Sequence, residues 1–190
     1  MSDNQPQIDT LRTELGETSS RAAKLWSKYA LAQLLRKPGE KKWSAAECVE
    51  HLNITNRAYL PRIEVAMREL EAKKTVPSVP MVMNFNAKLL RWWLEPPSRL
   101  KLPTTAAFQP PAVASAGEVL QAFQELNARI DEQLNRANGL ALDKAMISSP
   151  FAETMKYNVY SAFVLIVAHN RRHLWQAANT LRDQAMRFQG

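Results

Sequence analysis

Residues 43–52 read WSAAECVEHL and contain the start signal of a long helix. Ser44 and Glu47 form a capping box, in which the Ser44 hydroxyl accepts from the Glu47 amide and the Glu47 carboxylate accepts from the Ser44 amide. The apolar side chains that follow recur at helical spacing and predict one inward stripe. This stripe comprises Cys48, Leu52, Thr55, Tyr59, Ile63, Ala66, Met67 and Leu70. His51 lies on its edge, and Pro61 within it predicts a kink instead of a stop, because the pattern resumes afterwards.

Helical spacing of apolar residues predicts three further long helices. The first covers residues 8–35. The second follows another capping box at residues 115–118, with Gly139 placed to cap its end. The last begins near residues 151–155 and continues to about Arg187, on the order of 50 Å at 1.5 Å per residue.

A proline-rich crossover joins the second predicted helix to the third. Residues 76–111 contain seven of the 11 prolines, around an apolar segment at residues 84–94 that predicts a short helix. Trp92 and Trp93 in this segment either pack against the bundle or wall a pocket. The sequence therefore predicts an all-α four-helix bundle with a long Pro-rich crossover that carries a short helix. Its 190 residues, five glycines and lack of alternating strand patterns agree with a single helical domain over residues 1–190.

Several classes of protein are excluded by the pattern of apolar and cysteine residues. The first ten residues have no basic patch leading into an apolar run, so they do not resemble a secretory signal. The most apolar run, residues 159–168, is about ten residues long and far below the ~20 that span a bilayer. Cys48 is the only cysteine, which excludes an internal disulfide and a thiolate zinc site. We therefore expect a cytoplasmic protein without a membrane anchor.

The formal charge of +7 has two interpretations. It can attract an anionic partner, or it can belong to a solvated surface. The basic residues are spread along the chain, and no nucleic-acid-binding motif accompanies them. The charge alone therefore gives no clear nucleic-acid signal.

All three histidines of the chain fall at positions that can converge. His169 and His173 are four residues apart on one helix face, with Cβ atoms roughly 6 Å apart, so two imidazoles can reach one ion at ~2.0–2.1 Å. His51 on another helix is the only further histidine. The alternative is an accidental pair with His51 as an ordinary core histidine. Three neutral imidazoles would leave a coordination position open, as in catalytic metal sites.

Two stretches around these histidines resemble the DinB/YfiT-like superfamily. Residues 43–52 match its W-S-x-x-E-x-x-x-H-L pattern throughout. Residues 169–176 read HNRRHLWQ and match the H-x-x-x-H pair of its last helix, which is often followed by Leu and Gln. The motifs occur in the expected order, and with the helix pattern the resemblance covers nearly the whole chain.

The resemblance implies an up-down-down-up bundle in which His51, His169 and His173 bind one divalent ion. Zinc or nickel is the expected metal, with iron or manganese as alternatives. Relatives include S-transferases and isomerases that depend on a low-molecular-weight thiol, and others are described as metal-dependent hydrolases. We therefore expect a thiol-dependent transferase or isomerase first, and a metal-dependent hydrolase second.

Other candidate residues lie close to the histidines in sequence. Glu47 is a candidate general base, although its capping role competes, and Gln176 lies one turn beyond His173, where it can bond a metal-bound water. Arg171 and Arg172 are candidates for binding the carboxylates of a thiol cofactor, or else are solvated charges. Asn158 is a further candidate for the role given to Gln176, a hydrogen bond to a metal-bound water.

A different class of function also fits the sequence. A bundle that the ion only stabilises can act as a non-catalytic binding or stress-related protein. A small molecule or a thiol is the expected partner, and the family's habit suggests a homodimer, although no helix shows a distinct second apolar stripe.

Overall fold

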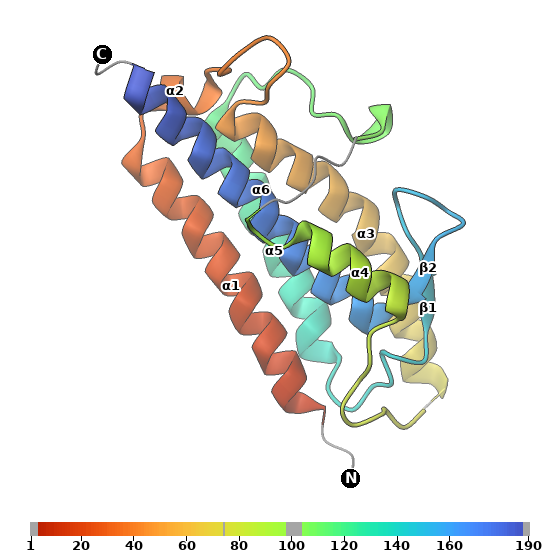
Figure 1. Ribbon diagram of the computed structural model, residues 1–190. Helices are drawn as coiled ribbons and strands as arrows, with labels where there is room; N and C mark the ends of the chain where they lie inside the picture. The colour runs from red at the N-terminus through yellow and green to blue at the C-terminus, as the bar shows by residue number, and fades with distance from the viewer. Residues whose placement is uncertain (1–3, 74, 98–103, 188–190) are drawn as a thin grey trace.

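The computed structural model describes residues 4–73, 75–97 and 104–187. Its four longest helices lie side by side and confirm the predicted bundle (Figure 1). These helices are α1 (Gln5–Lys28), α3 (Ala45–Lys73), α5 (Ala116–Arg136) and α6 (Val159–Arg187). The shorter elements are α2 (Leu31–Leu35), α4 (Phe85–Leu94), the 3-10 turn η1 (Ala106–Phe108) and the strands β1 (Met146–Ser148) and β2 (Lys156–Asn158).

The bundle has the expected up-down-down-up order. Arg129 of α5 pairs with Glu64 of α3 at 3.0 Å, and Arg136 pairs with Glu71 at 2.7 Å. Both pairs join residues 65 positions apart, which is the register of two parallel helices. In Figure 1, α3 and α5 both descend while α1 and α6 ascend. The crossover makes this order possible because it returns the chain to the upper end before α5 begins.

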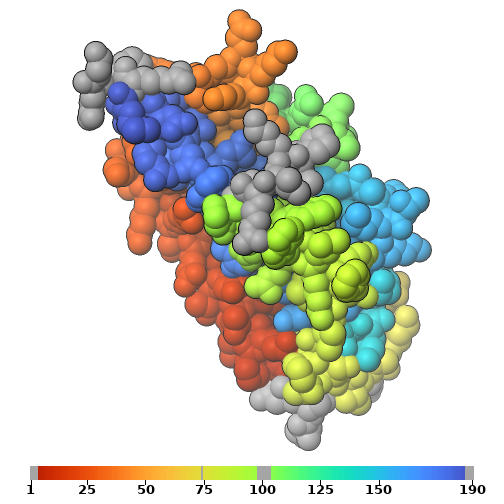
Figure 2. Space-filling model, viewed as in Figure 1, coloured from red at the N-terminus to blue at the C-terminus, as the bar shows by residue number. Residues whose placement is uncertain are grey.

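The predicted short helix of the crossover is present as α4, which packs against α6. Figure 2 shows α4 on the surface in front of the bundle. Glu95, directly after α4, accepts two hydrogen bonds from Arg171 of α6. This ion pair ties the crossover to the last helix.

The prediction of one helix over residues 8–35 is wrong at residues 29 and 30. Tyr29 and Ala30 have extended backbones with ψ of 143° and 146°, so α1 ends at Lys28 and α2 starts at Leu31. The break lets Leu34 turn fully into the core. Helical spacing did not reveal it, because the buried residues on both sides keep nearly the same period.

The predicted start of the last helix is also wrong. A hairpin precedes it, in which β1 and β2 pair antiparallel with Ile147 opposite Tyr157. Helix α6 then begins at Val159, where the Asn158 side chain accepts from the Ser161 amide at 2.8 Å. Asn158 is therefore a helix cap here. Three-residue strands are too short for alternation to show, so only the partner strand identifies them.

Two other local predictions are confirmed. Helix α3 continues through Pro61, and the Ser115 hydroxyl accepts from the Glu118 amide at 3.3 Å. The predicted cap at Gly139 is wrong by two residues: Ala137 is the C-cap of α5, and Gly139 beyond it has φ of +77° and donates its amide to Asn4. No helix in the described part of the chain combines the length and apolar character that a membrane crossing requires.

The core consists of two apolar clusters, one toward each end of the bundle. The first includes Ile8, Ile63, Ile130 and Phe163. The second includes Trp26, Leu52, Phe123 and Leu174. Between these clusters the helices carry buried polar side chains, and the histidines belong to this level.

Candidate metal centre

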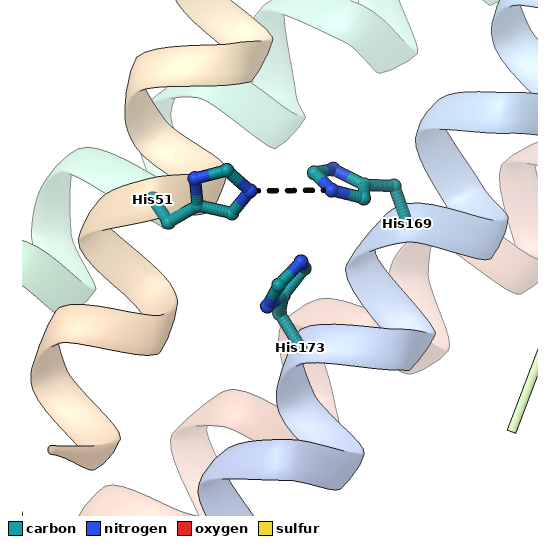
Figure 3. A group of neighbouring side chains, drawn as sticks. All are labelled: His51, His169 and His173. Atoms are coloured by element: carbon teal, nitrogen blue, oxygen red, sulfur yellow. Dashed lines mark hydrogen bonds between the residues drawn. The ribbon is translucent and has the colours of Figure 1, made fainter. Parts of the chain in front are cut away.

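The three histidines converge at the middle of the bundle. His51 comes from α3, and His169 and His173 come from successive turns of α6 (Figure 3). The Nε2 atoms of His51 and His169 are 3.3 Å apart, and one ring nitrogen from each histidine lies within 4.8 Å of the others. All three residues are at most 8 % exposed. The antiparallel packing of α3 and α6 therefore gathers donors that are 118 positions apart.

Hydrogen bonds on the outer ring nitrogens direct two lone pairs toward each other. His51 Nδ1 lies 2.7 Å from the Phe108 carbonyl oxygen, which only accepts, so Nδ1 carries the proton and Nε2 the lone pair. Thr55 donates its hydroxyl proton to the Leu52 carbonyl at 3.0 Å, so its oxygen is left to accept from His169 Nδ1 at 3.5 Å. The two Nε2 lone pairs then face each other.

This arrangement fits a metal ion. Two nitrogens bound to zinc at ~2.0–2.1 Å with a tetrahedral angle are about 3.3 Å apart. The His51–His169 separation has this value without adjustment. Two facing lone pairs repel unless a cation lies between them, and hydrogen bonds to the other ring nitrogens are the usual support of metal-binding histidines. In addition, the buried Nδ1 of His173 has no hydrogen-bond partner among the described residues.

Burial keeps the imidazoles neutral. It lowers the pKa of His51, and it lowers the pKa values of His169 and His173 well below the ordinary 6.5. The other histidines and the nearby Arg172 lower the latter two pKa values further, while an interaction with Gln176 partly opposes this for His173. Neutral imidazole is the form that binds a metal.

Glu47 is engaged in the helix cap. Its carboxylate accepts from the Ser44 amide at 2.8 Å, and its amide donates to the Ser44 hydroxyl at 3.0 Å, which confirms the predicted capping box. Its other carboxylate oxygen pairs with Lys37 at 2.7 Å. Glu47 is 2 % exposed and is not among the residues that line the cleft described next.

A cleft of about 780 Å³ opens beside the histidines. Aromatic rings wall it: Trp43 lies 5.0 Å from the His51 ring, and Phe151 lies 5.8 Å from the His169 ring, between centroids. Trp93 of α4 and Trp175 of α6 line it as well, whereas Trp92 is largely exposed. The sequence predicted that the two crossover tryptophans either pack against the bundle or wall a pocket, and it did not distinguish between them. It missed Phe151 because this ring lies on a loop.

The other three candidate polar residues near the histidines differ in position. Gln176 and Arg172 line the cleft, and Arg172 also donates to the Trp93 carbonyl at 2.8 Å. Burial lowers the pKa of Arg172, but a guanidinium keeps its charge in proteins. Arg171 instead pairs with Glu95 and Glu14, so it ties α6 to neighbouring elements outside the cleft.

The charged residues around the cleft are mainly basic. Lys41, Lys42 and Arg172 line it together with Asp183, which is the only carboxylate in the described lining. The wall therefore combines an apolar middle with a positive balance. Such a surface suits a small molecule with an apolar body and an anionic group.

Comparison with known proteins identifies a similar fold and a family. No curated protein matches the chain. Among solved structures, the chain is similar to YfiT from Bacillus subtilis, described as "a probable metal-dependent hydrolase with an unusual four-helix bundle topology". The sequences are 17 % identical, the likeness covers 95 % of this chain and 89 % of that chain, and the TM-score is 0.60. The family model of the DinB superfamily matches residues 14–177, so the chain belongs to the DinB superfamily.

Proposed function

We propose that this protein is a divalent-metal-dependent enzyme that transfers or isomerises groups on a low-molecular-weight thiol. The observation that carries the metal site is the pair of facing Nε2 atoms of His51 and His169, 3.3 Å apart, with His173 beside them. Zinc or nickel suits three imidazole donors, and iron or manganese is the alternative. An ion held there would act as a Lewis acid that acidifies a bound thiol or water molecule.

The cleft supports a thiol as the substrate. Glu47 is held in the helix cap, and Asp183 is the only carboxylate in the described lining. A reaction that relies on a carboxylate base therefore has little support from these residues, whereas a thiol acidified at a metal needs no such base. Lys41, Lys42 and Arg172 offer positive charge to the carboxylate of a thiol.

The residues of the chain have distinct roles in this proposal. The three histidines hold the ion, and Trp43 stacks beside His51 and His173 and keeps water from one side of the site. Gln176, which interacts with His173, orients that ring or a ligand beside it. We place the enzyme in the cytoplasm, where thiols stay reduced.

Metal-dependent hydrolysis is the second candidate. The likeness to YfiT favours it, since that protein is described as a probable metal-dependent hydrolase. A role as a non-catalytic, metal-stabilised binding protein is the third. It predicts that metal raises stability without any turnover.

Metal content and turnover together test the proposal. Untagged protein is analysed for metal beside His169→Ala and beside Asn179→Ala, a control on the same helix that keeps all three histidines. We expect about one ion per chain in the parent and the control, and little in His169→Ala. No metal in the parent after dialysis against zinc, nickel, iron and manganese would overturn the proposal.

The loaded protein is then given a panel of small thiols with an aromatic electrophile, and separately carboxylic esters and amides. Loss of free thiol that depends on His169 supports the transferase. Ester or amide cleavage without thiol supports the hydrolase. Neither reaction, together with a metal-dependent rise in melting temperature, supports the binding protein.

A further inference from the structure

Three hydroxyl groups lie together in a cluster that the metal site does not use. The Oη atoms of Tyr59 on α3 and Tyr157 on β2 are 2.5 Å apart and share a hydrogen bond, and the Ser149 side chain is near enough to Tyr157 to lower its pKa against the rise that burial causes. Ser149 Oγ accepts from the Phe151 amide at 3.2 Å, which fixes its position. The hairpin that sequence analysis missed therefore delivers two of the three hydroxyls.

Two residues of this cluster line the cleft. They are Tyr59 and Ser149, whereas Tyr157 is fully buried. Each hydroxyl carries one proton, and either tyrosine can be the donor of the bond between them. If Tyr157 donates to Tyr59, the Tyr59 proton remains for a ligand. If Tyr59 donates to Tyr157, the Tyr59 oxygen keeps a lone pair that can accept. The Tyr59 hydroxyl can therefore serve a donor or an acceptor.

The hydroxyls lie along the same wall as the histidines but further along it. Tyr59 follows His51 by eight residues on α3, which is about 12 Å along the helix axis. The ring of Phe151 bridges the distance, because its centroid is 6.3 Å from that of Tyr59 and 5.8 Å from that of His169. A ligand that reaches from the histidines to Tyr59 must pass over this apolar ring.

We propose that the Tyr59 hydroxyl, hydrogen-bonded to Tyr157, is a second binding point of the cleft, for an uncharged oxygen group at the far end of the ligand. This inference deepens the proposed function, on which it rests for the metal-binding end of the ligand. The substrate is then an elongated molecule with a thiol at one end, an apolar middle and a hydroxyl, carbonyl or amide at the other.

The surroundings explain why this oxygen group is uncharged. Burial raises the pKa values of Tyr59 and Tyr157, so both stay neutral. Arg62, whose charge acts on both tyrosines, is itself paired with Glu153. A charged ligand group here would lose its water without gaining an opposite charge, which is costly, whereas a neutral group exchanges one hydrogen bond for another.

The test uses matched pairs of thiols on zinc-loaded protein. Straight ω-mercapto alcohols of four to eight carbons are compared with alkanethiols of the same carbon number, and binding is followed through the fluorescence of the tryptophans that line the cleft. We compare the ratio of alcohol affinity to alkanethiol affinity at each chain length. At one length we expect this ratio to show a gain of about 3- to 10-fold over the neighbouring lengths, the effect of one neutral hydrogen bond. Tyr59→Phe removes this gain and leaves metal content and alkanethiol affinity unchanged.

Two further variants complete the test. Tyr157→Phe keeps the Tyr59 hydroxyl without its support and reduces the gain. Tyr160→Phe is the matched control, because the Tyr160 hydroxyl accepts from Gln7 and does not line the cleft. A gain that persists in Tyr59→Phe, or no gain at any chain length, overturns the proposal. If the tyrosine variants lower the melting temperature and leave the affinity gain unchanged, the two hydroxyls only hold the hairpin against α3, and the proposal is overturned.

Failure of the metal site is distinguishable from failure of this inference. If the protein binds no zinc, the proposed function fails, and benzyl alcohol and toluene replace the thiols because neither needs a metal. A preference for benzyl alcohol in the parent that disappears in Tyr59→Phe still supports the hydroxyl site. An equal preference in both proteins overturns it.

Discussion

Asn170 donates a hydrogen bond to the Oδ1 atom of Asn127 over 3.3 Å, directly beside His169 in the sequence. The oxygen of Asn170 in turn accepts from Asn56 at 3.4 Å, and Asn127 donates to Ser19 at 2.8 Å. These four side chains link α3, α6, α5 and α1 in one polar layer between the two apolar clusters. The layer favours one register of the helices, the register in which α3 and α6 present their histidines to each other.

Asn170→Ala tests this layer. It leaves polar groups of Asn56 and Asn127 buried without their partner, at about 1–3 kcal/mol for each group in the free energy of unfolding. We expect a clear loss of stability in urea unfolding at neutral pH. Gln121→Ala on the exposed side of α5 is the control, with an expected change within about 0.5 kcal/mol. Equal midpoints for the two variants would contradict the structural role of the layer.

Zinc should stabilise the folded protein through the histidines. At a free zinc concentration 100 times the Kd, the free energy of unfolding rises by about 2.7 kcal/mol, because the ion binds only the folded site. His51→Ala and His173→Ala should show little of this rise. Thermal melts with and without zinc measure it, and a rise of the same size in either variant would place the ion elsewhere.

The metal-free protein should lose stability below neutral pH. The pKa values of the three buried histidines are lowered in the folded state, so the unfolded chain binds protons first. Stability is then complete above the unfolded pKa of about 6.5 and is lost as pH falls, by at most about 1.4 kcal/mol per pH unit for each histidine. Urea unfolding between pH 7.5 and 5.5 measures the slope.

The variant His169→Phe provides the control for this slope, since it removes one of the three groups. Its stability should change less steeply over the same range. If parent and variant have the same slope, protonation of His169 does not govern acid stability.

Substitutions of Glu47 separate capping from catalysis. Glu47→Gln can keep both bonds of the capping box and loses only the ion pair with Lys37. Glu47→Ala leaves the buried Ser44 amide without its acceptor, at about 1–3 kcal/mol, while the residue-47 amide still donates to the Ser44 hydroxyl. We expect metal content and turnover of Glu47→Gln to match those of the parent. A loss of turnover in Glu47→Gln with unchanged metal content and stability would instead identify Glu47 as a general base.

The helical fold follows from local signals in the sequence. Residues 43–52 specify the cap and the inward stripe of α3, and the spacing of His169 and His173 places both rings on one face of α6. These features depend on residues within a few positions of each other, so periodicity and capping rules can identify them. Both motifs also carry the resemblance to the superfamily.

The rest was decided by contacts between distant segments. The break at Tyr29, the β1–β2 hairpin and the position of Phe151 depend on what each segment packs against, which local patterns do not contain. Sequence placed Tyr59 in the inward stripe of α3 but could not show that its hydroxyl meets that of Tyr157, 98 positions away. Sequence determined which residues face inward, because helix geometry is local, whereas packing alone decided which of them meet.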